Sequence, residues 1–189
     1  MFTSITQALS AQPVVPHNPP PDSLDICFQH SCARHAKITL GPVIRAKLAS
    51  TFAAPALDAE VERAAIARTI AVLEQYVGRL TGTDRDLGGT FPGAFQPGQM
   101  DCIDEASNTT HYLRLFEQLG WLHWHEVLEP ATRLPIPRSW WPHTTAVIRE
   151  RDTHSEFAVD SWFDANGHPP HIVDLKRWRH GWKPQESSQ

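Results

Sequence analysis

The fold of this chain is decided by the stretch Gly98-Gln-Met-Asp-Cys-Ile-Asp-Glu-Ala-Ser-Asn-Thr-Thr-His-Tyr-Leu-Arg-Leu-Phe-Glu-Gln-Leu-Gly120. Its apolar side chains recur at helical spacing, which predicts an amphipathic helix with one buried stripe: Ile103, Ala106, Thr110, Leu113 and Phe116. Asp101 is placed to cap this helix, Asp104 lies in a capping-box position, and Gly120 is placed to end it.

Cys102 opens the predicted helix. A thiol in the first turn lies where unpaired backbone N–H groups and the positive end of the helix dipole favour the thiolate, so Cys102 is a candidate nucleophile. A small buried residue is the other common role of a free cysteine. Asp101, Asp104 and Glu105 surround the thiol with negative charge, which acts against its ionisation. The helix alone leaves both interpretations open.

Composition limits the class of protein and its partners. The 189 residues, 41% hydrophobic and 20% charged, are typical of one globular domain, which we place at residues 23–182, after a proline-rich extended arm (1–22) and before a frayed tail (183–189). A net charge of -4 without a Lys/Arg-rich run argues against a nucleic-acid partner. No apolar run reaches the roughly 18 residues of a membrane span. Without a visible secretory signal we expect a cytoplasmic protein, or an exported one if the start codon is misassigned.

Two segments near the start alternate as strands do, residues 24–28 and 35–40, and they predict a β-hairpin. Cys27 and Cys32 flank its turn. They could form a disulfide in an exported protein, or remain thiols in the cytosol. A metal site would need two more ligands, and none is close in sequence.

Two helices should follow the hairpin. Pro42 fits the first turn of one that runs to about residue 52, and Asp58 can cap a longer one that ends near residue 80. The second has an apolar stripe that predicts core packing: Ile66, Ile70, Leu73, Val77 and Leu80. Its charged residues predict a solvated face: Glu60, Glu62, Arg63, Arg68 and Glu74.

The Gly/Pro-rich segment 81–100 is a long loop that we take as one wall of a cleft. Residues 121–127 alternate as a strand, with His123 and His125 on one face, and a loop should begin at Pro130. Paired histidines can bind a metal, but without a third ligand a structural role is favoured. Trp140 and Trp141 could rim the cleft or cover the core.

Residues 143–150 and 156–163 predict a second hairpin, with the turn centred on residues 151 and 152. Paired residue numbers then sum to 303, which places His143 directly across from Asp160. Ala146, Ile148, Phe157 and Val159 would share the opposite face, and Trp162, on the face of Asp160, could shield this pair from water. A free cysteine, a histidine and its carboxylate partner form the layout of nucleophile, base and orienting acid. His111 is too far along the helix from Cys102 to be the base, roughly 13 Å.

Gly98-x-x-Asp101-Cys102 opening a helix, with His143 beginning one strand and Asp160 in the next, resembles the bacterial transglutaminase-like cysteine proteinases of the papain-like superfamily. The resemblance covers about residues 98–163. It implies an α+β fold in which a nucleophile-bearing helix packs on an antiparallel sheet, with the N-terminal hairpin and helices as additions. It also implies Cys102 as nucleophile, His143 as general base and acid, and Asp160 as the residue that orients His143.

The predicted function is cysteine-dependent acyl transfer on amide bonds of a protein or peptide substrate, through a thioester that water or an amine resolves. The backbone N–H of Cys102 and a side-chain donor, Gln99 in preference to Gln96, would hold the oxyanion. The alternative is a non-catalytic module that keeps this fold and binds a protein or peptide. No cofactor or metal is expected, and metal binding by His123 and His125 with His168 or His171 ranks last. The remaining chain predicts a turn at 164–167, a strand at 171–173 that closes the sheet edge, and a short helix with Trp178.

Overall fold

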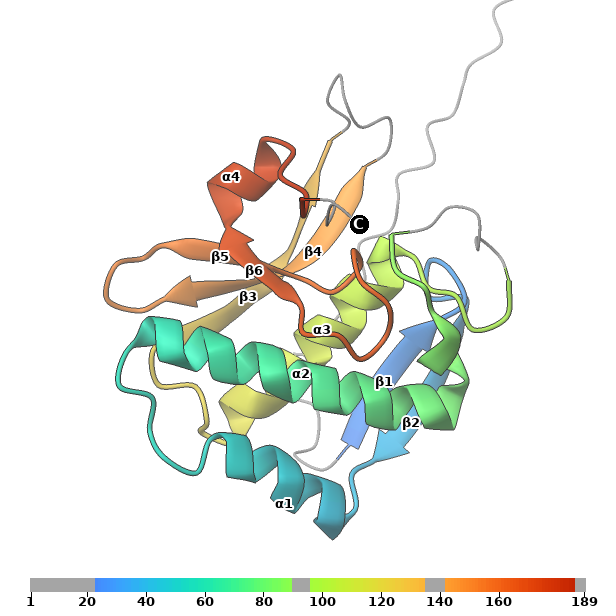
Figure 1. The fold of residues 1–189 in the computed structure, drawn as a ribbon, viewed down its shortest axis with the longest axis horizontal. Helices are drawn as coiled ribbons and strands as arrows, with labels where there is room; N and C mark the ends of the chain where they lie inside the picture. Colours follow the sequence, from blue (N-terminus) through green and yellow to red (C-terminus); the bar gives the residue numbers. More distant parts are fainter. Residues whose placement is uncertain (1–22, 90–95, 135–141, 186–189) are drawn as a thin grey trace, which may run out of the picture.

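The structure, a computed structural model, describes residues 23–89, 96–134 and 142–185. These segments form an α+β fold with two antiparallel sheets and four α-helices (Figure 1). The strands are β1 (Ser23–Phe28), β2 (Arg34–Thr39), β3 (His125–Arg133), β4 (His143–Glu150), β5 (Glu156–Asp160) and β6 (His171–Asp174). The helices are α1 (Pro42–Thr51), α2 (Ala59–Thr81), α3 (Cys102–Gln118) and α4 (Leu175–Arg179), with a 3-10 turn at Thr83–Arg85. The arm 1–22, Trp140, Trp141 and the end of the tail lie outside the described residues.

The helices begin where local capping signals predict them. Pro42 is the first residue of α1, and the Asp58 side chain accepts a hydrogen bond from Val61 N at 2.8 Å before α2. At α3, the Asp101 and Asp104 side chains form a full capping box. Gly120 follows α3 with a φ of 71°, a left-handed conformation that glycine adopts without steric cost. These boundaries confirm the predicted helix starts.

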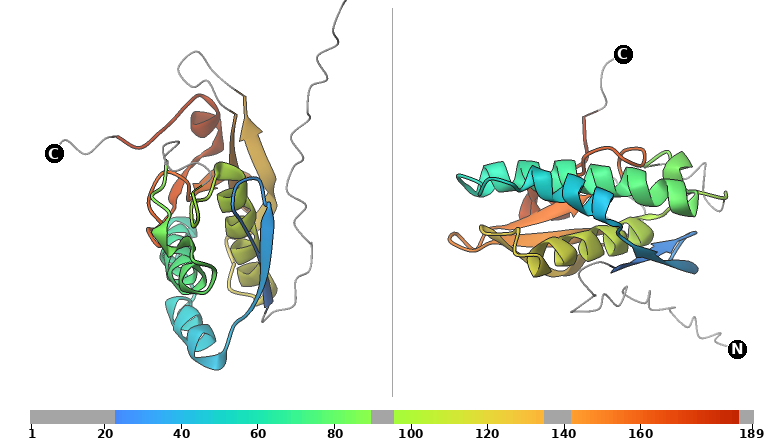
Figure 2. Two further views of the ribbon diagram at one scale, coloured as in Figure 1. Left: turned by 90° about the vertical axis from the view of Figure 1, so that its right-hand side faces the viewer. Right: turned by 90° about the horizontal axis from the view of Figure 1, so that it is seen from below.

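The two faces of the four-stranded sheet, whose order is β3-β4-β5-β6, pack against different layers. One face meets α2 and α3 in the main core, through Ala146, Ile148 and Val159. The other face meets α4, where Val147 and Ala158 pack against Trp178. Figure 1 shows α3 between the two sheets, and Figure 2 shows α2 and α3 lying side by side. Helix α3 is therefore the central element, and its N-terminus lies close to the start of β4.

The predicted faces of α2 are wrong at three positions. Ile66, Ile70, Leu73 and Val77 are buried as predicted, but Leu80 is 56% exposed. Glu62 and Glu74, predicted to be solvated, are 0% and 4% exposed. The Glu62 carboxylate accepts the backbone N–H groups of residues 123, 124 and 125, and Glu74 accepts that of Gly167 at 3.0 Å. Buried carboxylates of this kind serve as acceptors for loop N–H groups, and such distant partners cannot be seen in helical periodicity.

The strand predicted at 121–127 is displaced in the structure. Strand β3 begins at His125, because Glu62 takes the N–H groups of residues 123–125. It continues through Pro130 to Arg133, with a register shift between Leu128 and Ala131. Pro130, predicted to begin a loop, is tolerated here because β3 is an edge strand with a bulge.

The predicted register of the second hairpin is also wrong, by two residues. Paired numbers in β4 and β5 sum to 305, as in Ala146–Val159 and Ile148–Phe157. The turn has four residues, since Glu150 N donates to Ser155 O at 2.9 Å across it. An even shift preserves which face each side chain occupies. His143 therefore remains on the face of Asp160, as its diagonal neighbour rather than directly opposite it.

Candidate active site

Cys102 lies at the first position of α3, half-buried, with its thiol at the start of β4. The backbone N–H of Thr144, the residue after His143, faces the sulfur. Burial raises the pKa of the Cys102 thiol to about 12, and the negative charges of Asp101 and Asp160 act in the same direction. The N–H groups of Thr144 and of Cys102 itself oppose this shift. The resting residue is therefore a neutral thiol.

His143 and Asp160 form a buried pair. His143 Nε2 lies 2.7 Å from Asp160 Oδ2, and the two side chains are 6% and 1% exposed. Asp160 Oδ2 also accepts a hydrogen bond from Trp178 Nε1 at 2.7 Å, and Oδ1 accepts one from Trp162 N at 3.2 Å. Because three donors hold the carboxylate, it fixes the imidazole with Nε2 as the donor. Nδ1 is then the ring nitrogen that can accept a proton.

Aromatic rings enclose this pair. The centroid of the His143 ring lies 4.8 Å from that of Trp162, 5.3 Å from Phe163 and 5.5 Å from Trp178. Apolar cover of this kind excludes water and strengthens a hydrogen bond between charged groups. Trp162 therefore takes the shielding position predicted for it.

The three predicted residues come from the start of α3, the start of β4 and the end of β5, and the structure brings these three ends together. Within the described residues no hydrogen bond joins the Cys102 thiol to the His143 ring. The contact between them runs through the adjacent Thr144 N–H and through the field of Asp160 on the sulfur. Catalytic hydrogen bonds are often long in an enzyme without substrate and shorten on binding.

The two glutamines predicted as oxyanion donors lie elsewhere. The side chain of Gln99 donates from Nε2 to Arg85 O at 2.6 Å and accepts from Leu87 N at 3.3 Å, so it fastens the preceding loop. Gln96 is exposed, and its carbonyl accepts from Gln99 N at 3.1 Å. The Gln99 side-chain amide would therefore have to leave Arg85 and Leu87 to reach the site. The backbone N–H of Thr144, a donor that the sequence analysis missed, already faces the sulfur of Cys102.

Arg133 is a second residue that the sequence analysis missed. It pairs with His143 across β3 and β4, and its guanidinium lies 4.6 Å from the centroid of Trp178. NH1 donates to the carbonyl oxygens of Trp178 at 2.6 Å and Trp182 at 2.8 Å. Burial lowers the Arg133 pKa, while the negative charge of Asp160 opposes that shift. Arg133 thus places a positive charge beside the site, at a position that sequence reasoning assigned to a loop.

Three buried carboxyls lie near one another: Glu105 on α3, Glu74 on α2 and Asp86 in the loop that follows α2. Burial raises the pKa of Glu74 to about 8, and nearby Asp86 adds to this. Burial and the charge of Glu74 hold the pKa of Glu105 well above its usual range. Burial likewise raises the pKa of Asp86. The carboxyls of this group therefore keep their protons to higher pH than exposed carboxyls do.

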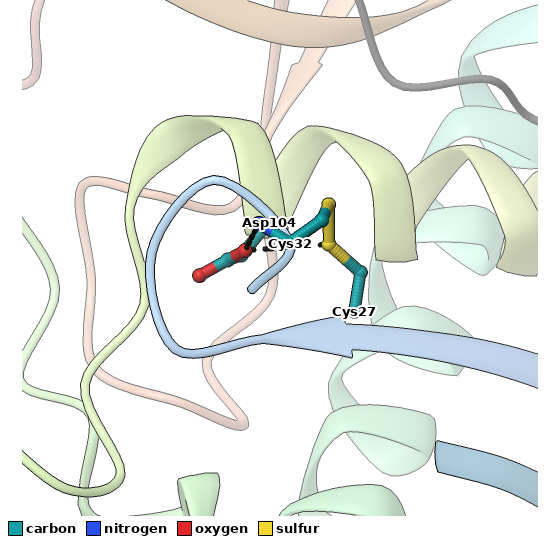
Figure 3. A group of neighbouring side chains, drawn as sticks. All are labelled: Cys27, Cys32 and Asp104. Carbon is teal, nitrogen blue, oxygen red and sulfur yellow. Dashed lines mark hydrogen bonds between the residues drawn. A yellow bond between two sulfur atoms is a disulfide. The ribbon is translucent and has the colours of Figure 1, made fainter. Parts of the chain in front are cut away.

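Cys27 and Cys32 form a disulfide, with Asp104 beside it (Figure 3). Across the described segments this is the one group of three potential metal ligands. The histidines predicted last as ligands do not gather: His125 is held by Glu62 at 2.9 Å, and His123 is exposed. Within these segments the four histidines therefore do not form the metal site that the sequence analysis ranked last.

Comparison of the chain with protein-family models, curated proteins and solved structures finds no match. In the part of the chain that the structure describes, no helix combines the length and apolar character needed to cross a lipid bilayer.

Proposed function

We propose that the protein is a cysteine-dependent acyl-transfer enzyme of papain-like, transglutaminase-like architecture that acts on amide bonds of peptides or proteins. One observation carries this proposal. The imidazole of His143 is held by a buried carboxylate at 2.7 Å, and the N–H of the next residue faces the only thiol outside the disulfide. Side chains distant in sequence thus supply a nucleophile, a base and an orienting acid within one small region.

The reaction would proceed through a thioester. His143 Nδ1 accepts the thiol proton while Cys102 Sγ attacks the amide carbonyl, and the carbonyl oxygen takes up negative charge. The N–H groups of Cys102 and Thr144, which face the sulfur, would donate to that oxygen, with Gln99 a candidate after a change of partner. The C–N bond then breaks as His143 returns the proton to the leaving amine. Water or a second amine attacks the thioester, which releases an acid or a new amide and restores the thiol.

The state of the thiol determines what His143 must do. With a pKa of about 12, only about one thiol in 10⁵ would be ionised at pH 7. A resting thiolate–imidazolium pair is therefore not the reactive form. The proton must move to His143 during the attack, and Asp160 stabilises the resulting imidazolium.

The raised thiol pKa and the burial of His143 favour a second candidate. A thiol whose pKa is raised to about 12 and an imidazole that is almost fully covered also suit a protein or peptide-binding module that keeps this fold without catalysis. In that case His143, Asp160 and their aromatic cover stabilise the sheet and α4 alone.

Alkylation of Cys102 by iodoacetamide separates the two candidates. Since the chain has three cysteines and two form the disulfide, the oxidised protein reacts at one position. For the enzyme we expect the labelling rate at pH 7 to exceed the rate set by hydroxide alone, because His143 accepts the thiol proton during the attack. It should fall by roughly 10²-fold in His143→Ala, the size of a general-base contribution. His123→Ala, which removes an exposed imidazole, is the matched control. A rate that simply follows hydroxide concentration and is equal in all three proteins would refute catalysis and support the module.

A further inference from the structure

The disulfide loop has an unusual backbone. Gln29, His30, Ser31 and Cys32 have φ values of 68°, 58°, 54° and 57°. Four successive residues other than glycine in the left-handed region are disfavoured by contacts of their Cβ atoms. Interactions from outside the loop must therefore hold it in this conformation.

Those interactions come from the start of α3. Asp104 accepts the backbone N–H of His30 at Oδ2 and that of Cys32 at Oδ1, both at 2.7 Å. Asp101 accepts the N–H of Ser31 at 2.8 Å. The loop closed by the disulfide is thus held by hydrogen bonds to the two carboxylates that flank Cys102.

Asp104 also touches the disulfide itself. Its Oδ1 lies 3.3 Å from Cys27 Sγ, and Figure 3 shows the carboxyl reaching from α3 toward the bridge. Cys27 is fully buried, whereas Cys32 is partly exposed. Of the two cysteines only Cys32 has exposed surface, so we infer that a reductant from solvent attacks its sulfur and that Cys27, which faces Asp104, is the leaving thiol.

We propose that Cys27–Cys32 is a redox-active disulfide that a dithiol reduces, with Asp104 as the proton donor to the leaving sulfur of Cys27. One thiolate of the dithiol attacks Cys32 Sγ, a mixed disulfide forms, and the Cys27–Cys32 bond breaks as Asp104 protonates Cys27. The second thiol of the dithiol then attacks its own sulfur in the mixed disulfide and releases Cys32. The dithiol is oxidised to its cyclic disulfide, the protein gains two thiols, and Asp104 regains a proton from solvent. This activity does not depend on the proposed function of Cys102.

The surroundings of Asp104 suit this role. Burial, aided by the negative charge of Asp101, raises the Asp104 pKa to about 7, against the N–H groups of Cys32, Asp101 and His30. The titratable groups around it are Asp101 and Glu105 on α3 and His30 in the loop. Both forms of Asp104 are therefore populated near neutral pH, as a group that gives and regains a proton requires.

The test is the rate of reduction by dithiothreitol between pH 5.5 and 8, with quenched samples alkylated and the Cys27 and Cys32 peptides quantified by mass spectrometry. The dithiothreitol thiolate rises about tenfold per pH unit in this range. Because protonated Asp104 declines above pH 7, we expect the wild-type rate to rise only about twofold between pH 7 and 8. The reduction rate of Asp104→Asn should rise about tenfold between pH 7 and 8. Asp25→Asn, on the exposed face of β1, is the matched control and should keep the wild-type profile.

The slope, and not the absolute rate, is the readout, because Asp104→Asn also loosens the loop. Equal slopes in wild type and Asp104→Asn would overturn the proposal. If Asp104→Asn does not fold, the wild type decides: a tenfold rise between pH 7 and 8 overturns the proposal, and a rise near twofold supports it. Brief treatment with glutathione, followed by acid quenching, should give a mixed disulfide at Cys32. A mixed disulfide at Cys27 would contradict the assignment of the attacked sulfur.

Discussion

Asp160 is the position where the candidate site is most open to test. Its carboxylate accepts three hydrogen bonds, from His143 Nε2, Trp178 Nε1 and Trp162 N, while its side chain is 1% exposed. The substitution Asp160→Asn keeps the shape and removes the charge. An asparagine has one accepting oxygen and one donating nitrogen. Whichever way its amide turns, the nitrogen points at a donor of the site.

The magnitude follows from these three bonds. If the asparagine oxygen keeps His143 and Trp178, both bonds change from charge-assisted to neutral, which costs about 1–1.5 kcal/mol each. The amide nitrogen then faces Trp162 N–H, which leaves a buried donor unsatisfied at a cost of about 1–3 kcal/mol. We expect the free energy of unfolding to fall by about 3–6 kcal/mol, close to the cost of breaking other buried pairs. The alkylation rate of Cys102 should fall by roughly 10²-fold, because an uncharged partner does not stabilise the imidazolium.

Urea denaturation at pH 7 and iodoacetamide labelling measure the two effects. Asp164→Asn is the matched control, since Asp164 lies 2.8 Å from His171 Nε2 but the two side chains are 43% and 32% exposed. Asp164→Asn should lower the free energy of unfolding by less than about 1 kcal/mol. Trp178→Phe removes one donor to Asp160 and keeps the bond to His143, so it should lower stability and leave the labelling rate within about threefold. An Asp160→Asn protein with unchanged stability and labelling would refute the reasoning.

Three further predictions concern the fold. Glu62→Gln should lower the free energy of unfolding by about 3–5 kcal/mol in urea at pH 7. Despite burial, hydrogen bonds from His125 and backbone N–H groups hold the pKa of Glu62 in the folded protein below 4.5. The stabilising contribution of Glu62 is therefore present above about pH 4.5 and is lost as the pH falls through the pKa of the folded protein, which urea denaturation at a series of pH values checks. Gly88→Ala should lower the free energy of unfolding by at least about 3 kcal/mol, because a Cβ there would lie under 2.5 Å from the facing backbone. Gly120→Ala, where a Cβ would have no atom within 4 Å, should lower it by only about 1 kcal/mol. Thermal denaturation of the two variants measures both effects. Reducing the Cys27–Cys32 disulfide should remove about 2 kcal/mol, measured by denaturation with and without dithiothreitol.

The helices could be predicted because their signals are local. Pro42, Asp58 and Asp101 act within one turn of the helix that each begins. The register of the β4–β5 hairpin could not be predicted, because its four-residue turn places His154 in the left-handed region without the glycine or asparagine that usually marks such a turn. The predicted register differs from the observed one by two residues, and an even shift leaves each side chain on the same face of the sheet. His143 and Asp160 were therefore still predicted to share a face.

The errors at Glu62 and Glu74 have a different origin. Each carboxylate satisfies backbone N–H groups far along the chain, 61 residues away for His123 and 93 for Gly167. Helical periodicity describes which residues share a face but not which loops will cover that face. Arg133 could not be placed from the sequence for the same reason, because its position beside the site is fixed by hydrogen bonds to the carbonyl groups of the distant Trp178 and Trp182.

The helix start favours a thiolate at Cys102, whereas the neighbouring acidic residues were predicted to oppose its ionisation, and in the structure the opposing effect of Asp101 is present. The first N–H groups of α3 are already bound by the Asp101 side chain, whose negative charge offsets the positive end of the dipole. Burial and the nearby charge of Asp160 then raise the thiol pKa to about 12. A helix start that must be capped by a carboxylate cannot also stabilise an adjacent thiolate to the same degree. Under the proposed function, nucleophilic attack by this thiol would therefore require proton transfer to His143, and we expect the imidazole rather than the helix dipole to control the reactivity of Cys102.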